Sequence, residues 1–288
     1  MLTTITTCLH CGTVNHAADN LCAACGGNLV VDDFHSTRFH TPHYYPIADP
    51  DLIPNLQPFS LPDTLSTTLK LFARHFWLIT KIVFVIVTPL EILKATTLAN
   101  IADDPQVKIL TMLLGAACNI VIAPALIYVF MKEMQTGKTA SVQEAFRWGL
   151  SKIPQLALCA VAAYFLQGVG YLLCIIPGII IGLHYAVVYP VAILEDVSIR
   201  EVFSRSSDLT SGSRLEILAA QILIQAVMLL VTAGLTFLLS QPNFAPLTII
   251  GSVVVDIAEQ LPVVLAFVMY LGLLKSDKLL NRRLYAKN

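Results

Sequence analysis

Four cysteines near the N-terminus have the spacing of a metal site. They form two Cys-x-x-Cys-Gly motifs, which begin at Cys8 and Cys22 and are completed by Cys11 and Cys25. Two thiolates three positions apart can hold one ion from a tight turn, and two such turns supply the closed tetrahedral shell of structural zinc. The motifs therefore predict one structural Zn²⁺ bound by four cysteines. A pair of disulfides is the alternative, and it requires an oxidising compartment.

This cysteine-rich segment, residues 1–30, is too short to bury a core of its own. Metal binding would therefore have to supply its folding free energy. Residues 1–37 contain no Lys or Arg, and a zinc ion with four thiolates is itself net negative. Because phosphate binding needs positive charge, we expect no nucleic-acid partner and interpret the segment as a structural or protein-contact module.

The same segment resembles the short N-terminal zinc ribbons of many bacterial membrane proteins. The resemblance is carried by "NHAADNLCAACGGNL", in which Asn and Ala precede the second cysteine pair. It covers about the first 30 residues, and it implies a metal but no particular function.

The rest of the chain has the composition of an integral membrane protein. The 288 residues are 56% hydrophobic and only 13% charged, with a formal net charge of −1, whereas soluble proteins carry about 25% charged residues. The predicted fold is an all-α bundle of about six transmembrane helices with amphipathic cytoplasmic surface helices, preceded by the ribbon. We predict three parts: residues 1–30 as zinc ribbon, 31–65 as a proline-rich linker, and 66–288 as the membrane domain with a basic tail.

Six apolar stretches are long enough to cross a bilayer, which takes about 20 helical residues. They lie near 76–98, 108–131, 153–174, 177–195, 214–240 and 246–274. Lys and Arg are concentrated after spans two, four and six, and positive charge favours the cytoplasmic side. This predicts that both termini face the cytoplasm of a bacterial inner membrane. The cysteine motifs would then lie in a reducing compartment, which favours zinc over disulfides.

Two similar segments follow spans two and four. Each begins with a Ser-x-x-Glu capping box, in which the serine accepts a free amide and the glutamate reaches back to another, and each carries apolar residues at helical spacing. We therefore predict two short amphipathic helices at the cytoplasmic surface. Their marker residues are Ser141, Glu144 and Phe146 in one, and Ser198, Glu201 and Phe203 in the other.

Several polar residues lie inside the predicted spans, where ionisable groups are costly and are functional candidates. Lys94 is three positions after Glu91 and can pair with it, and Asp256, Glu259 and Gln260 lie at a similar height in span six. These five residues are predicted to cluster between spans one and six. Asn119 and His184 lie nearer the midplane. One interpretation is contact between helices, and the other is a polar cavity for a lipid headgroup or an ion.

One long segment resembles a known family. It is "IIPGIIIGLHYAVVYPVAILEDVSIREVFSRSSDLTSG", which is similar to the membrane domain of glycerophosphoryl diester phosphodiesterases and to the related YciC-like proteins. The resemblance covers roughly residues 66–280 and implies a six-helix membrane domain. It does not imply the hydrolase, because the chain has no room for a catalytic barrel.

The sequence indicates that the protein is not an enzyme, because it has no His-Glu-x-x-His, Gly-x-Ser-x-Gly or phosphate-loop motif. Our first hypothesis is a scaffold or recruiting subunit of a membrane complex. Its contacts would be membrane lipid and a protein partner or a second copy, with the ribbon as contact module. The alternative is a transporter or lipid-handling protein that uses a polar intramembrane cavity.

Overall fold

The computed structural model describes residues 5–7, 14–16, 57–94, 96, 104–137, 139–195, 197–239 and 248–285. The four predicted zinc ligands and the predicted linker as far as residue 56 lie outside these residues. The chain separates into two units, Met1–Thr41 and Pro42–Asn288.

The described part of the first unit is an antiparallel pair of strands. β1 (Ile5–Thr7) pairs with β2 (Val14–His16), and the register places Ile5 opposite His16 and Thr7 opposite Val14. The six residues between the strands, 8–13, contain the first of the two Cys-x-x-Cys motifs. The two paired strands therefore flank this motif in the sequence.

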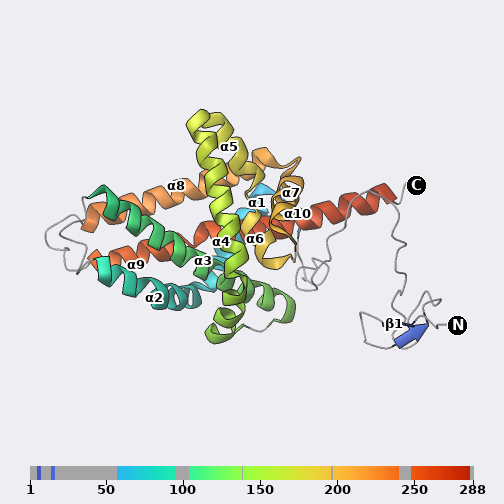
Figure 1. The fold of residues 1–288 in the computed structure, drawn as a ribbon, viewed down its shortest axis with the longest axis horizontal. Helices are drawn as coiled ribbons and strands as arrows, with labels where there is room; N and C mark the ends of the chain where they lie inside the picture. The colour runs from blue at the N-terminus through green and yellow to red at the C-terminus, as the bar shows by residue number, and fades with distance from the viewer. Residues whose placement is uncertain are drawn as a thin grey trace. The chain divides into compact units, whose positions relative to one another are not determined.

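The second unit is built of helices (Figure 1). In the described residues they are α1 (Leu61–Arg74), α2 (Phe76–Leu93), α3 (Pro105–Thr136), α4 (Val142–Leu173), α5 (Ile175–His184), α6 (Val188–Leu194), α7 (Ile199–Thr210), α8 (Arg214–Leu239), α9 (Thr248–Ala258) and α10 (Leu261–Tyr285). Helix α9 packs against both α2 and α8, and α3 packs against α2 and α4.

Six stretches of the described helices are long and apolar enough to cross a membrane, as predicted. Helices α2, α3, α4 and α8 each supply one, α5 with α6 supplies the fourth, and α9 with α10 supplies the sixth. Large apolar side chains cover the outside of α8, including Leu215 at 82% and Leu230 at 74% exposed. Exposed apolar surface on this scale suits contact with lipid or another protein, not water.

Spans four and six are present as predicted, but neither is one continuous helix. The fourth is interrupted at Tyr185–Val187 and the sixth at Glu259–Gln260. Each interruption comes within one turn before a proline, Pro190 or Pro262. A proline has no amide N–H, so the carbonyl four residues earlier loses its usual helical donor. Span six thus breaks beside two of the predicted polar residues.

The predicted short surface helix at Ser141–Phe146 does not exist as a separate element. Ser141 does cap a helix, because its Oγ accepts the amide of Glu144 at 3.2 Å. The helix then continues without interruption through Pro154 to Leu173 as α4. Gly149 lies between Phe146 and the third span, but it packs close to the backbone of Ala125 on α3 and the helix continues through it.

The second predicted surface helix forms as α7. The Ser198 amide donates to Glu201 Oε2 at 2.9 Å, which completes the predicted capping box. Its apolar face, however, is used inside the protein: Val202 is fully buried, and the ring of Phe203 lies 4.8 Å from that of Tyr185. Helix α7 therefore packs on the end of the bundle, and its apolar face is not free to enter lipid.

The membrane unit also begins earlier than the predicted boundary at residue 66. The Phe59 amide donates to the Gly272 carbonyl at 3.1 Å and to Ser276 Oγ at 3.0 Å, which ties the chain to α10 before α1 starts. Helix α1 then packs along α10 and α8.

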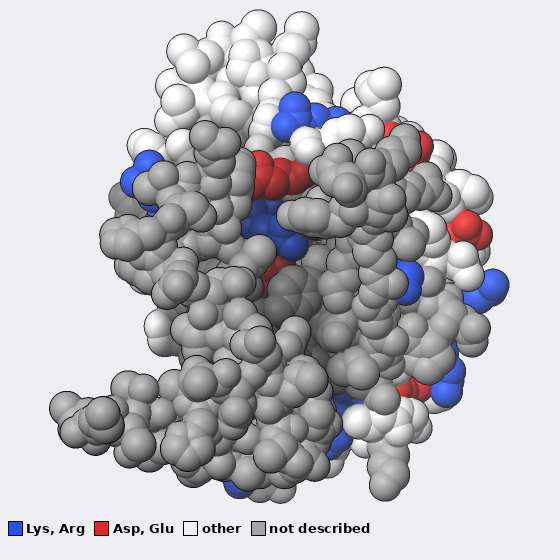
Figure 2. Space-filling model, turned by 90° about the vertical axis from the view of Figure 1, so that its right-hand side faces the viewer, with Lys and Arg blue, Asp and Glu red and all other residues white. Residues whose placement is uncertain are grey.

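Two ion pairs join helices at this part of the second unit, one between α1 and α3 and the other between α7 and α10. Arg74 pairs with Glu133 at 3.1 Å, and Arg205 pairs with Asp277 at 3.6 Å. Figure 2 looks onto the side of the molecule that is on the right in Figure 1, and both charge types lie on that face.

Candidate functional site

A cavity of about 360 Å³ lies where the break of span six faces α2, α3 and α4. Its volume falls in the range of small-molecule sites, roughly 300–1,000 Å³. Polar groups come mainly from the break itself and from the end of α2, and apolar groups from the helix walls. The lining residues are Val87, Leu90, Lys94, Met112, Gly115, Ala116, Cys118, Asn119, Ile122, Tyr164, Asp256, Glu259 and Gln260.

The structure brings together most of the predicted intramembrane polar residues. Lys94, Asn119, Asp256, Glu259 and Gln260 all line the cavity. They come from three separate parts of the chain, so their proximity follows from the packing of α2, α3 and α9 and not from local sequence.

Two further predicted residues lie outside the lining. Glu91 is buried and forms the predicted ion pair with Lys94. His184 is at the break of span four, where its Nδ1 lies 2.7 Å from the Ile180 carbonyl oxygen. Glu91 therefore acts on the cavity through Lys94, and His184 is not part of it.

The side chain of Gln260 fastens the break of span six to its surroundings. Its Nε2 donates to the Asp256 carbonyl at 3.0 Å and to Asn119 Oδ1 at 3.2 Å. One backbone carbonyl that the interrupted helix leaves free is thereby satisfied, as membrane interiors require. The Asn119 amide is held in turn by its own bond to the Gly115 carbonyl at 3.4 Å.

Two acceptor atoms in this region have no hydrogen-bond partner among the described residues. They are Asp256 Oδ2 and Gln260 Oε1, and both are buried. A buried acceptor without a donor costs free energy. Both residues line the cavity, so the two unsatisfied acceptors belong to side chains of its wall.

The break of span four is closed by protein groups instead. Ser206 on α7 donates its hydroxyl to the His184 carbonyl at 2.9 Å, and Ser206 is fully buried. Gln155 Nε2 on α4 donates to the Val197 carbonyl at 2.9 Å, which fixes the segment between α6 and α7. The Ser206 side chain of α7 thus does at this break what a ligand would do at the other.

A second set of buried polar contacts lies at the end of span four, one helix (α6) beyond the break. Glu195 at the end of α6 is only 2% exposed and accepts from Tyr270 Oη at 2.9 Å, while Arg205 Nε lies 3.5 Å from its Oε2. Burial raises the pKa of Glu195 above its ordinary value, although the Arg205 guanidinium and the Tyr270 hydroxyl lower it. The network joins α6, α7 and α10.

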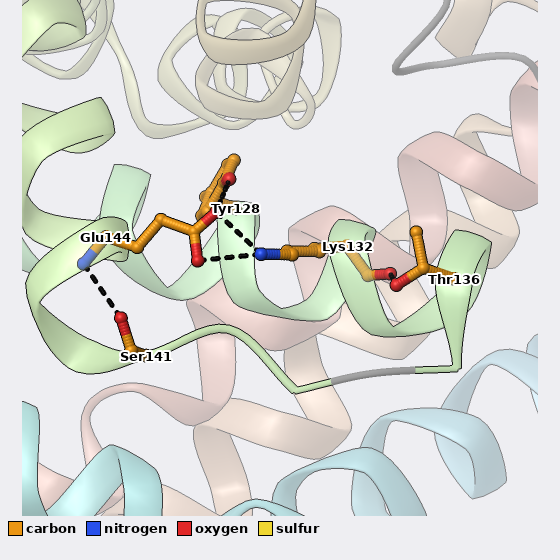
Figure 3. Close-up of polar contacts among 5 residues, drawn as sticks. All are labelled: Tyr128, Lys132, Thr136, Ser141 and Glu144. Carbon is orange, nitrogen blue, oxygen red and sulfur yellow. Dashed lines mark hydrogen bonds and ion pairs between the residues drawn. The ribbon is translucent and has the colours of Figure 1, made fainter.

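The predicted surface residue Glu144 has a different role, which Figure 3 shows. Its carboxylate bridges Lys132, at 2.6 and 2.7 Å, and Tyr128 Oη, at 2.6 Å. The ring of Tyr128 also stacks on Trp148 with centroids 4.8 Å apart. These contacts connect the end of α3 to the start of α4, and a capping residue thereby becomes a link between two spans.

Sequence reasoning did not find Gly115, Cys118 or Tyr164 as cavity residues. They have no charge and no motif, and they line the cavity only because α3 and α4 face the break of span six. The sequence signal nearest to the break itself is Pro262, which follows it by two residues.

Comparison of the chain with protein-family models, with curated proteins and with solved structures finds no match. The resemblance to the phosphodiesterase membrane domain and YciC-like proteins therefore stays a prediction, as does the resemblance of the first 30 residues to zinc ribbons. The fold defines the class: a multi-pass helical membrane protein.

Proposed function

We propose that this is a non-enzymatic membrane protein that binds a small polar ligand, or the headgroup of a lipid, in the cavity at the break of span six. The observation that carries the proposal is the pair of buried acceptors without partners, Asp256 Oδ2 and Gln260 Oε1, in a cavity large enough for a ligand. Interrupted helices are a recurrent setting for ligand sites in transporters, so binding would serve transport or lipid handling.

The structure also weakens one argument for a scaffold. That hypothesis used the amphipathic helices as free surfaces, but the apolar face of α7 is packed on the bundle, and the other helix is the start of α4. The cavity therefore supports ligand binding better than the surface helices support recruitment.

A cavity-filling variant tests the proposal without altering charge. Gly115 lines the cavity, and a Cβ placed on it would meet no atom within 4 Å. Gly115→Leu should therefore occupy the space and exclude the ligand. Gly234→Leu on α8 is the matched control, because a Cβ there is equally unobstructed and the residue is outside the cavity.

The measurement is native mass spectrometry of the full chain released gently from its own membrane. We expect wild type and Gly234→Leu to retain the same small molecule or lipid, and Gly115→Leu to lose it. Retention by all three proteins, or by none of them, would contradict the proposal.

A second proposal concerns the first unit, as a zinc-bound protein-contact module. It is supported by the pairing of β1 with β2, because these strands flank Cys8 and Cys11 in the sequence, and four cysteines in this pattern suit structural zinc. The bound zinc would fix this segment. Cys8→Ser with Cys22→Ser should abolish zinc, measured by metal analysis, and should release any stoichiometric protein partner while the helical unit stays folded.

We further propose that the face with α1 and α7 is cytoplasmic, in a bacterial inner membrane. Supporting this, Arg74 ends α1, Lys132 lies in the last turns of α3, Arg214 begins α8 and Arg205 lies within α7, and the positive-inside rule expects such residues on the cytoplasmic side. Reporter fusions at both termini should be active in the cytoplasm only.

A further inference from the structure

The geometry points to an organic ammonium ion as the ligand of the cavity, with its N–H groups donated to Asp256 Oδ2 and Gln260 Oε1. This inference rests on the proposed function and names the chemistry of its ligand. Three observations carry it: the orientation of one amide, the charges of the wall, and the apolar remainder of the lining.

The orientation of the Gln260 amide is fixed by its partners. One of them is the main-chain carbonyl of Asp256, 3.0 Å away, and a carbonyl can only accept. The atom facing it must therefore be the nitrogen, which leaves the oxygen Oε1 as the unpartnered atom. Gln260 lines the cavity and is only 1% exposed, so bulk water does not supply a donor to this oxygen.

The charges of the wall also favour a cation. Three carboxylates, of Glu91, Asp256 and Glu259, lie in or beside the wall, and Lys94 is engaged with Glu91. In the part of the chain that the structure describes, neither Asp256 nor Glu259 has an ion pair. At the break the negative C-terminal end of α9 meets the positive N-terminal end of α10, so the partial charges of the two helix ends offset each other. The side-chain charges therefore decide the sign of the ligand.

The rest of the lining favours an organic cation over a bare ion. Val87, Leu90, Met112 and Ile122 supply hydrocarbon walls. The cavity of about 360 Å³ is much larger than the roughly 30 Å³ that one water occupies in the liquid. An ammonium group with an apolar body satisfies both the acceptors and the hydrocarbon, and either a soluble amine or an aminophospholipid headgroup has this chemistry.

The test uses the full chain in phosphatidylcholine nanodiscs, whose lipid headgroup has no N–H donor. n-Butylammonium is titrated by saturation-transfer NMR beside two probes of similar size, 1-butanol and butyrate. We expect butylammonium to bind more tightly than either. Asp256→Asn should weaken it about tenfold or more, because a charge-assisted hydrogen bond is lost. Glu216→Gln, an exposed carboxylate at the start of α8, should leave binding unchanged.

Adding phosphatidylethanolamine to the nanodiscs identifies the source of the ammonium. Competition with butylammonium assigns the site to the lipid headgroup, and absence of competition assigns it to a soluble amine.

Equal or tighter binding of butanol or butyrate would overturn the ammonium inference, and so would an Asp256→Asn variant that binds butylammonium like wild type. In those cases a molecule whose retention depends on Gly115 would still support the proposed function. If Gly115→Leu retained the same molecule as wild type, the proposed function itself would be contradicted.

Discussion

Two membrane spans of this protein are each interrupted shortly before a proline, but different surroundings face the two breaks. In span four the break lies between α5 and α6, and Ser206 of α7 donates to the carbonyl it exposes. In span six the break lies between α9 and α10, and it faces a cavity with two unpartnered acceptors. The shared cause is a proline just beyond the break. The difference shows that a surface helix, α7, can close a break that otherwise stays available to a ligand.

The largest expected effect is at the end of span four, one helix beyond its break. Arg205→Ala would leave the buried carboxylate of Glu195 without its cation, and removal of one partner of a buried pair costs about 3–5 kcal/mol. We expect a loss of this size in the free energy of unfolding, measured by titration with sodium dodecyl sulfate in mixed micelles. Arg200→Ala, an exposed site on the same helix, should cost far less. A small loss for Arg205→Ala would mean that Arg205 does not stabilise this buried carboxylate.

The next effect isolates a single hydrogen bond. Ser206→Ala removes the donor to the His184 carbonyl, and an orphaned buried acceptor costs about 1–3 kcal/mol. The same unfolding titration measures the loss. Ser204→Ala, exposed on α7, is the control and should be nearly neutral. Equal stability of the two variants would show that water or another group replaces Ser206.

The equivalent change at the open break should affect stability less. Asp256→Asn removes a carboxylate that has no ion pair among the described residues, so without ligand the free energy of unfolding should change by less than about 1 kcal/mol. Ligand binding, not stability, should be lost. A destabilisation like that of Ser206→Ala would instead assign Asp256 to contacts between helices.

The smallest effect is a dependence of stability on pH. Burial raises the pKa of Glu195 above its ordinary value of 4.5, so the folded state binds this proton more tightly than the unfolded state. Its contribution is fully present below about pH 4.5 and is lost as pH rises through the folded pKa. Glu195→Gln keeps an acceptor for Tyr270 and should flatten this slope in thermal unfolding between about pH 5 and pH 8. Identical slopes for the two proteins would exclude Glu195 as its source.

Much of the helical bundle was predictable, because the lengths of the apolar stretches and the local spacing of residues were enough to predict the spans and one ion pair. Six apolar stretches predicted six spans, and the i, i+3 spacing predicted the ion pair of Glu91 with Lys94. The sequence positions of Asp256 and Glu259 predicted that they lie at a similar height to Lys94, and all three line one cavity. Hydropathy and helical periodicity are local properties, so the sequence contains them in full.

The breaks were not predictable from proline alone. Pro89, Pro124 and Pro154 lie inside uninterrupted helices, whereas Pro190 and Pro262 follow breaks. Whether a helix continues through a proline depends on neighbours that satisfy the freed carbonyl. The periodicity of α7 was equally ambiguous, since an apolar face suits either lipid or the end of a bundle. The predicted zinc site remains a prediction, because Cys8, Cys11, Cys22 and Cys25 lie outside the described residues.

Hydrogen–deuterium exchange at the two breaks, with and without n-butylammonium, tests the central claim most directly. The protein would be held in phosphatidylcholine nanodiscs, and peptides spanning Tyr185–Val187 and Glu259–Gln260 would be compared. We predict that butylammonium slows exchange at Glu259–Gln260 and leaves Tyr185–Val187 unchanged, because only the break of span six faces the cavity. Unchanged exchange at both breaks, or equal slowing at both, would contradict the account.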